Sequence, residues 1–437
     1  MLTTQDRSFD DLVEQFLGIR LPQQMAEAIF LSELPPDTQD FIMRMLSLMK
    51  RAGYSATGFN PALIRWLSTT IPSTLPSAWG GRIPPLTLPG RHRKLDEYVA
   101  KRNWAPGDQP SIFVDVGCGF PPVTTADTAG KLADWHIYGV DRSFADFVLY
   151  DSDRHYACFD QKGEFLYFQA FMSPSGRALY ADPDATRKRF KNFFNDLSPL
   201  LHGSDDTTSE TVEKDGNKLI RNQIRDFETD NLTFVKSDIT ELNLPPAKVI
   251  RCMNLLIYFK PEIRKMMARQ VGELLDDDGI LIAGTNGLGI QSRYTVYQKG
   301  TNGLFPQEFA FSPDNLGHIV FMPFFSIHDN DPEAMMLADL AGALRSDRQF
   351  WADFSNRMDE LLRHHDICER GSDGFLHFFQ EEMPPTEWFE KNAKLWRQIE
   401  TEGYHESAVS ALEKAGFESW VNPVGDIAIR PPAARFS

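Results

Sequence analysis

Apolar residues recur every three or four positions in several segments near the start of the chain, which is the spacing of one helix face. Residues that commonly cap helices, Ser8 and Asp37, stand before two of these segments. The pattern predicts helices in this region over residues 9–19, 23–34, 37–53 and 60–70. Five prolines and three glycines in residues 71–90 then indicate an extended connector.

From about residue 91 the pattern changes, and short apolar runs alternate with helical periodicity. Helices are predicted at residues 91–104, 124–134 and 261–275, the second of them capped by Thr124 or Thr125. Strands are predicted at residues 111–116, 136–140, 232–236, 248–254 and 279–284. Such alternation of strand and helix indicates a mostly parallel sheet with helices on both faces.

Residues 147–230 interrupt this alternation. They contain a predicted hairpin that turns near Lys162 and Gly163, followed by a helix. Residues 203–217 hold one apolar residue in fifteen and are predicted to be mobile. The hairpin spans residues 156–169 and the helix 184–201; later strands are predicted at 293–299, 309–312 and 318–327, and a closing hairpin at 419–432.

These elements predict an α/β fold with a doubly wound, Rossmann-like sheet and three domains. A helical N-terminal domain with its proline-rich connector covers residues 1–90. The sheet domain covers residues 91–330, with the insert at about 147–230, and a helical cap with a terminal hairpin covers 331–437. The 437 residues, 42% of them hydrophobic, are enough for a large core.

Composition narrows the classes of partner. A net charge of −16 is poorly suited to coating a phosphate backbone, so nucleic acid is an unlikely partner. No apolar run approaches the roughly 18 residues of a membrane span, and the N-terminus lacks the features of a secretory signal. The four cysteines are widely spaced, which indicates a reducing compartment, and we expect a cytoplasmic protein.

The run VDVGCGFPP, residues 114–122, carries the clearest chemical signal. Asp115 stands near the end of a predicted strand, and Gly117 and Gly119 allow the backbone to approach a ligand closely. Asp141 ends the next strand, where a carboxylate can accept hydrogen bonds from both hydroxyls of a ribose. Asp238 follows the third strand, so all these groups are expected at the edge where parallel strands end.

Pro122 decides between two classes of nucleoside cofactor. Dinucleotide-binding loops have a third glycine there, and a helix N-terminus donates N–H groups to the pyrophosphate. Proline has no backbone N–H group that could donate to a phosphate. A cofactor with a ribose and without phosphate fits better, and S-adenosylmethionine is such a molecule.

At these residues the chain resembles the class I S-adenosylmethionine-dependent methyltransferases. VDVGCG looks like their first motif, YGVDRS like the second and KSDI like the third. Residues 249–285 and the loop GFPPVT are similar to the chemotaxis-receptor (CheR-type) methyltransferases, and the likeness covers about residues 110–285. The resemblance implies a seven-stranded doubly wound sheet and S-adenosyl-L-methionine as cofactor.

The resemblance also implies the site residues. Tyr258 matches a residue near the transferred methyl group, where we expect it to orient the reactants. Cys118 is expected to fill space rather than to act as a nucleophile. The implied cofactor-binding residues are Asp115, Gly117, Cys118, Gly119, Asp141, Arg142, Asp238, Ile239, Asn254 and Leu255. The family has acids where this chain has Phe120 and Pro121, and an arginine where it has Met253.

Simpler interpretations stand beside these assignments. Asp238 could be a helix N-cap, Asn254 a turn residue and Tyr258 a core residue. No metal site is predicted, because the adjacent His364 and His365 point to different faces of a helix.

The predicted activity is methyl transfer to a small molecule in an enclosed pocket. Two alternatives stay open: a protein carboxyl (glutamate) O-methyltransferase of the chemotaxis type, and a protein that binds the cofactor without transferring a methyl group. The expected partner is a small-molecule substrate, a protein substrate is possible, and no membrane is involved.

Overall fold

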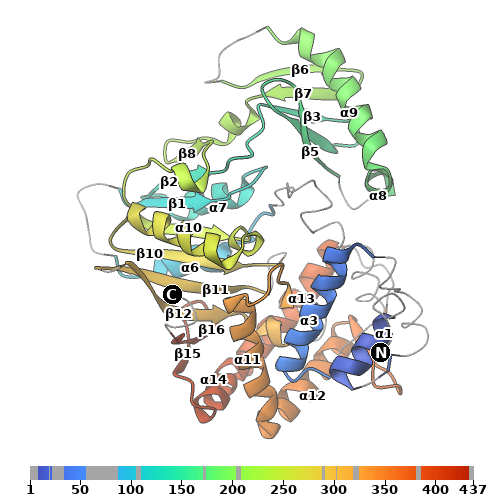
Figure 1. The fold of residues 1–437 in the computed structure, drawn as a ribbon, viewed down its shortest axis with the longest axis vertical. Coiled ribbons are helices and arrows are strands. Elements are labelled where there is room, and N and C mark those ends of the chain that lie inside the picture. Colours follow the sequence, from blue (N-terminus) through green and yellow to red (C-terminus); the bar gives the residue numbers. More distant parts are fainter. Residues whose placement is uncertain are drawn as a thin grey trace.

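Five parallel strands form one half of the central sheet (Figure 1). In spatial order they are β8 (Leu232–Val235), β2 (His136–Val140), β1 (Ile112–Val116), β9 (Ala247–Met253) and β10 (Leu275–Thr285). This is the doubly wound order, in which the chain moves outward in both directions from β1. The computed structural model describes residues 8–18, 20–21, 34–55, 87–104, 110–170, 174–202, 208–287, 291–301, 303–317, 324–379 and 385–432.

Four antiparallel strands complete the other half of the sheet. They are β11 (Arg293–Gly300), β12 (Gly303–Phe311), β16 (Ile427–Ile429) and β15 (Ser419–Val421), in that order from β10. The predicted α/β class and parallel core are confirmed, but among the described residues the sheet has nine strands rather than the seven that the resemblance implied. The difference arises at one edge, where the predicted C-terminal hairpin pairs with β12 and adds two strands.

Helices cover both faces of the parallel half, because successive strand residues point to opposite faces. Phe113 and Val249 pack with α6 (Arg93–Lys101) and α7 (Val123–Lys131) on one face. Val114 and Ile250 pack with α10 (Pro261–Leu274) and the short helix η7 (Ile239–Glu241) on the other. All four strand residues are fully buried, so this half of the sheet is a rigid base for the loops at its ends.

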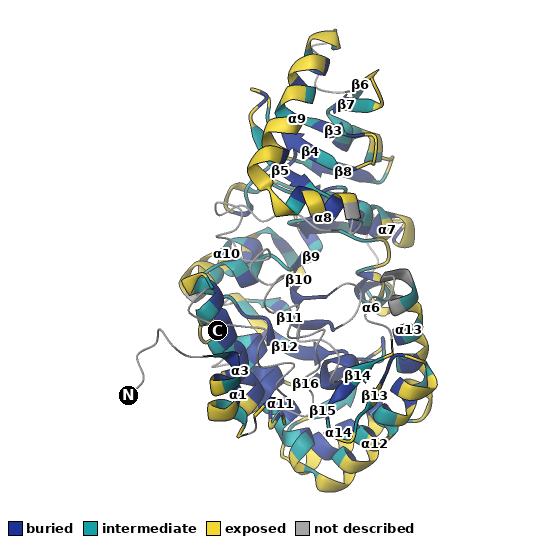
Figure 2. Cartoon of the chain, turned by 90° about the vertical axis from the view of Figure 1, so that its right-hand side faces the viewer, coloured by how far each residue is buried: buried dark blue, intermediate teal, exposed yellow. Residues whose placement is uncertain are grey.

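The segment inserted between β2 and β8 forms a separate five-stranded antiparallel sheet, which stands apart from the central sheet in Figure 1. In spatial order its strands are β5 (Phe165–Gln169), β4 (Tyr156–Phe159), β3 (Phe147–Tyr150), β7 (Asn217–Arg221) and β6 (Glu210–Lys214). It also contains α8 (Pro174–Ala181), α9 (Pro183–Leu197), η5 (Ser198–Leu200) and η6 (Gln223–Phe227). The outward face of α9 is exposed (Figure 2).

The structure confirms the predicted hairpin of β4 and β5 but overturns part of the prediction for residues 203–217. Residues 210–214 are not a mobile segment; they form β6, which pairs with β7. Arg221 and Glu210 form an ion pair of 2.8 Å across this pair of strands. A charged strand at a sheet edge needs few apolar residues, so hydrophobic patterning alone misses it. Residues 203–207 lie outside the described part of the chain.

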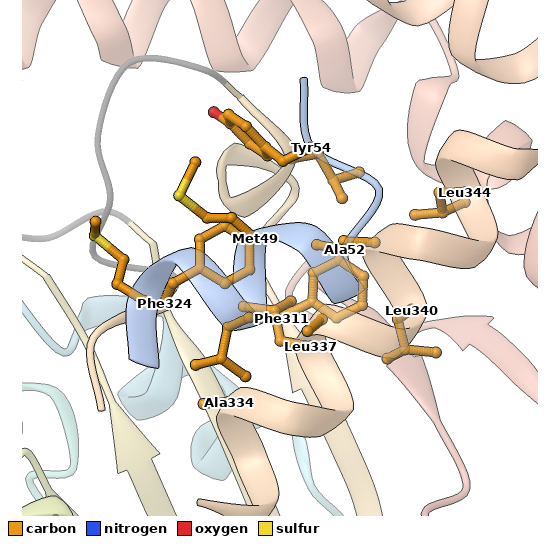
Figure 3. Packing of buried hydrophobic residues seen from close by; sticks show 14 of the residues in the cluster. Met49, Ala52, Tyr54, Phe311, Phe324, Ala334, Leu337, Leu340 and Leu344 are labelled. Atoms are coloured by element: carbon orange, nitrogen blue, oxygen red, sulfur yellow. The ribbon is translucent and has the colours of Figure 1, made fainter. Parts of the chain in front are cut away.

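Helices from both ends of the chain share one hydrophobic core. α3 (Pro36–Arg51) packs against α11 (Pro332–Ser346), where Met49, Ala52 and Leu337 are buried together (Figure 3). The other members of this body are α1 (Phe9–Leu17), α12 (Arg348–His364), β13 (Cys368–Arg370), β14 (Leu376–Phe378), α13 (Pro385–Thr401) and α14 (Tyr404–Lys414). Core packing between distant segments therefore joins the two ends of the chain.

The predicted starts of three helices can be compared with the structure, whereas several other predicted elements cannot. Ser8 caps α1 as expected, whereas α3 begins at Pro36 and Asp37 lies in its first turn. α7 begins at Val123, so the cap position falls on Pro122, which offers no side-chain acceptor, and Thr124 and Thr125 lie inside the first turn. The predicted helices at 23–34 and 60–70 fall almost wholly outside the described residues, as do most of the connector at 71–90 and of the strand at 318–327. Residues 324–327, the described part of that predicted strand, do not form a strand.

Within the described ranges, none of the helices combines the length and hydropathy that a bilayer crossing demands. All four cysteines are free and buried.

Candidate functional site

The predicted site residues gather at one edge of the central sheet, where β1, β2, β8, β9 and β10 end. We call this edge the carboxyl edge. Gly117 follows β1, Asp141 follows β2 and Asn254 follows β9. In a doubly wound sheet, ligands bind beyond the carboxyl ends of the strands. The binding point lies between two neighbouring strands whose connecting segments run over opposite faces of the sheet. β1 and β9 form that point here, since the chain turns from one side of β1 to the other.

The loop after β1 folds tightly around two glycines. Gly117 and Gly119 have φ values of 74° and 72°, a region that side chains rarely tolerate. The Gly117 amide donates to the Val140 carbonyl at 2.8 Å. A Cβ added at Gly117 would lie 3.0 Å from the Leu255 side chain. The backbone conformation therefore favours glycine at 117, and a larger residue there would also press on the Leu255 side chain.

Asp141 ties the end of β2 to this loop. Its Oδ2 accepts from the Gly119 amide at 3.0 Å, and its Oδ1 accepts from the Ser143 amide at 2.7 Å. The Ser143 hydroxyl also donates to Oδ1. These bonds use three of the roughly four acceptor positions of a carboxylate. The carboxylate is half-buried and keeps one position for a further donor.

Asp115 lies beneath the loop and is buried. Its two oxygens accept from Arg251 at 2.9 and 2.7 Å, and Oδ2 also accepts from the Thr125 hydroxyl at 2.6 Å. Arg251, on β9, also donates to Asp96 of α6 at 2.7 Å. The bonds of Asp115 therefore join β1, α7 and β9 under the carboxyl edge, and they occupy its carboxylate within the protein.

Burial and neighbouring charges shift the pKa values of the residues around Asp115 in different directions. Burial alone would lower the pKa of Arg251, but Asp115 and Asp96 raise it above its usual value. Burial raises the pKa of Asp96, which Arg251 opposes. Burial, with Arg251 and Arg91 nearby, holds the pKa of His92 well below its usual value. His92 is therefore uncharged at neutral pH, and the arginines supply the positive charge.

Asp238 has the capping role that the sequence left open. It precedes η7 and accepts from the Thr240 amide at 3.0 Å. This bond, together with the Thr240 hydroxyl and Arg142, lowers the pKa of Asp238. Arg142 lies 3.6 Å from its carboxylate, so two predicted site residues form an ion pair at the rim. Ile239 is buried beside them.

Asn254 joins the ends of β9 and β10. Its φ is 56°, a left-handed conformation that asparagine tolerates better than most residues. Its amide donates to the Gly284 carbonyl at 2.8 Å, and its side-chain oxygen accepts from the Asn286 amide at 2.9 Å. Asn254 is thus a turn residue that also sets the position of Leu255, against which Gly117 packs.

Tyr258 lies in the short helix η8 (Leu256–Tyr258), just beyond Leu255. Burial raises the pKa of Tyr258 to about 12, and the nearby charge of Arg91 opposes the rise. The hydroxyl therefore keeps its proton at neutral pH. It can donate a hydrogen bond but cannot act as a base there.

Arg91 is a functional candidate that the sequence interpretation missed. Its guanidinium donates to the Asn286 carbonyl at 2.6 Å, and burial lowers its pKa to about 10, which the electrostatic interaction with the Tyr258 hydroxyl opposes. The residues before Arg91 pass over the loop between β1 and α7. The Thr87 hydroxyl donates to the Pro121 carbonyl in that loop, and the Gly90 amide donates to the Asp127 carboxylate of α7. The proline-rich composition of 71–90 hid this placement, although the Arg-His-Arg run at 91–93 was a usable signal.

The insert contacts the same loop from its other side. The Tyr156 hydroxyl donates to the Phe120 carbonyl at 3.1 Å, and the Phe120 ring meets the rings of Tyr156 and Phe227 edge to face. Phe120 is therefore buried among aromatic residues where the chemotaxis-receptor enzymes have an acid. Burial raises the pKa of the neighbouring Cys118, which stays a neutral thiol and fills space.

Comparison with known proteins gives no family for this chain. No family model matches it, and no curated protein does. Among solved structures it is similar to the magnesium protoporphyrin IX methyltransferase of Synechocystis PCC 6803 with bound S-adenosylmethionine, at 15% identity and a TM-score of 0.20. That match covers 45% of this chain and 58% of the other, less than two thirds of the enzyme's length.

A second similar structure is an O-methyltransferase family 2 protein of Planctomyces limnophilus DSM 3776 in complex with apigenin. The identity is 11%, the match covers 91% of this chain and 74% of the other, and the TM-score is 0.24. The fold rests on the strand order, and the site rests on its own geometry.

Proposed function

We propose that the chain is a methyltransferase that binds S-adenosyl-L-methionine across the carboxyl edge and transfers its methyl group to a small molecule. One observation carries the proposal. The glycine loop after β1 and the Asp141 carboxylate after β2 are joined by a hydrogen bond at the point where the strand order reverses. That is where a doubly wound sheet binds a nucleoside.

The polarity of the edge favours this cofactor over a nucleotide. Asp141 and Asp238 would repel a phosphate, whereas a ribose offers hydroxyl donors to a carboxylate. Pro121 and Pro122 have no N–H group at the start of α7, where a pyrophosphate would need donors. A cofactor without phosphate meets neither obstacle.

Each end of the cofactor has a candidate partner. Asp141 would accept from the ribose, and Arg142, Asp238 and Ile239 would border the adenine. Asn254 and Leu255 would support the middle of the molecule, next to Gly117. The charge of Arg91 acts on Tyr258, and its guanidinium would pair with the carboxylate at the amino-acid end. Asp115 would act through Arg251 and Thr125 by holding the loop rather than by touching the cofactor.

The chemistry is an in-line displacement at the methyl carbon. The cofactor, when bound, would supply a methyl group on a sulfonium, and an acceptor lone pair would displace the thioether, which would leave with the electron pair of the carbon–sulfur bond. The protein contributes orientation and exclusion of water. Tyr258 would orient the acceptor as a hydrogen-bond donor, because its pKa of about 12 leaves it protonated.

Carboxyl methylation of a protein is the second candidate. The likeness to the chemotaxis-receptor type favours it at five positions: Asn254, Leu255, Ile257, Tyr258 and Phe259. Incubating the chain with labelled S-adenosylmethionine, and with either small-molecule or protein fractions, would separate the two by the acceptor that becomes labelled.

The test of the cofactor site is an Asp141→Ala variant measured by calorimetry with S-adenosylhomocysteine. Loss of this charged acceptor, and of its bond to the Gly119 amide, should weaken binding at least about tenfold. Asp153→Ala, at an exposed turn of the insert, is the matched control and should bind like the unchanged protein. Equal affinity of both variants would remove the ribose role from Asp141, and a wild-type chain without measurable binding would end the proposal.

A further inference from the structure

We propose that Arg264 and His328 are positioning residues for the segment 254–259, which carries Asn254, Leu255 and Tyr258. This inference rests on the proposed function, since it gives that segment its role. It adds two residues that were not among the predicted site residues, and both lie outside the carboxyl-edge loops.

Three consecutive carbonyl groups of the segment accept hydrogen bonds from these two side chains. Arg264 donates from Nε to the Phe259 oxygen at 2.9 Å and from Nη2 to the Ile257 oxygen at 3.2 Å. His328 Nε2 lies 3.1 Å from the Tyr258 oxygen between them. A carbonyl can only accept, so Nε2 carries the proton in this contact. The backbone on both sides of Tyr258 is therefore held from outside.

The remaining terminal nitrogen of Arg264 connects the segment to the helical body. Nη1 forms an ion pair of 2.9 Å with Asp331, and both side chains are almost fully buried. Asp331 is also the N-cap of α11, accepting from the Ala334 amide at 2.8 Å. Hydrogen bonds to charged groups are stronger than neutral ones, and Arg264 presents its donors in a fixed planar arrangement. α11 thus serves as the anchor of the Tyr258 segment.

Besides the bonds of Asn254 and the burial of Ile257, few hydrogen bonds within the segment hold its shape. η8 is a single turn, with hydrogen bonds of 3.2 Å from the Tyr258 amide and 3.1 Å from the Phe259 amide. The ends of such a turn leave carbonyls that need partners. A misplacement of about 1 Å in a group that orients reactants can cost a large factor in rate. The same segment would also support the cofactor, so its position should affect cofactor affinity.

The experiment combines amide hydrogen exchange with S-adenosylhomocysteine calorimetry on the full chain. Arg264→Gln and His328→Leu remove the donors, while Arg264→Lys and His328→Gln keep a donor at a similar reach. Arg269→Gln is the matched control, since it lies on the same helix and its side chain is 85% exposed. In the donor-removing variants Arg264→Gln and His328→Leu, we expect faster exchange in residues 254–260 and about fivefold weaker binding of S-adenosylhomocysteine. The donor-keeping variants should recover part of both effects, and Arg269→Gln should change neither.

Exchange in β1 should stay unchanged in every variant, because a positioning role is local. Unchanged exchange at 254–260 in both donor-removing variants would overturn the proposal. Faster exchange with wild-type affinity, or without recovery in Arg264→Lys and His328→Gln, would also overturn it, since the contacts would then be structural only. If the wild-type chain binds no S-adenosylhomocysteine, the proposed function fails, and the exchange data alone decide whether these side chains hold the segment.

Discussion

Arg251 and Asp115 lie side by side on β9 and β1, and both are buried. The sequence pattern marks Asp115 as an acid near a strand end and predicts a cofactor contact. The structure adds that Arg251, Asp96 and Thr125 complete a polar group under the glycine loop. A buried charge of this kind depends on its partner, because removal of the partner leaves the other charge without compensation.

Replacing Arg251 by methionine should therefore destabilise the chain strongly. Two carboxylates would remain buried without their cation, so the free energy of unfolding should fall by about 3–5 kcal/mol in urea denaturation. Arg269→Met, on an exposed face of α10, should change it by no more than about 0.5 kcal/mol. A small loss in Arg251→Met would mean that the group is hydrated or weakly coupled.

At the scale of elements, the insert has a hydrophobic core of its own. Phe159 of β4 stacks on Phe194 of α9 with ring centroids 4.4 Å apart, and Phe190 is fully buried beside them. The opposite face of the inserted sheet belongs to the core of the main sheet, through Val148, Cys158 and Tyr167. The insert is thus stabilised separately on one face and attached to the glycine loop on the other.

A Phe190→Ala substitution should loosen the insert and leave the main sheet intact. Loss of a buried phenylalanine costs about 3–5 kcal/mol through transfer and cavity effects. Amide exchange should rise in β3, β4, β5 and β7, while β1 and β9 keep their protection. Phe193→Ala, at a half-exposed position of the same helix, should have a smaller effect. A uniform rise in exchange over the whole chain would show that the insert is not a separate unit.

At the scale of the whole molecule, a buried charge cluster joins the main sheet to the helical body. Glu333 of α11 accepts from the Thr295 hydroxyl of β11, and Asp331, Arg264 and Arg293 surround it. Burial first, and then the charge of Asp331, raise the pKa of Glu333 from 4.5 to about 7, while the two arginines oppose the rise. Its neutral form is therefore favoured in the folded chain.

This shift predicts a pH dependence of stability with a definite sign. Because the folded pKa lies above the unfolded one, Glu333 contributes stability that is complete below about pH 4.5 and is lost as pH rises toward 7. Glu333→Gln should remove this contribution, so the wild-type chain should lose up to about 1.4 kcal/mol per pH unit relative to the variant. Urea denaturation at several pH values measures the difference. Glu413→Gln, at an exposed position, should run parallel to the wild type, and a parallel curve for Glu333→Gln would contradict the prediction.

The sequence by itself determined the features that depend on neighbours along the chain. Alternating apolar runs predicted β1, β2, β8, β9 and β10, and the spacing of Gly117, Gly119 and Asp141 predicted that these residues lie together beyond the strand ends. These follow from local periodicity and from backbone freedom at glycine.

Only the tertiary structure decided the pairings between distant segments. It placed Arg251 against Asp115, Arg91 beside Tyr258, and Arg264 on the carbonyls around Tyr258. It also turned the polar run at 210–214 into β6, because pairing with β7 satisfies its backbone. Charges and edge strands depend on partners that lie far away in the sequence, and no pattern along the chain identifies them.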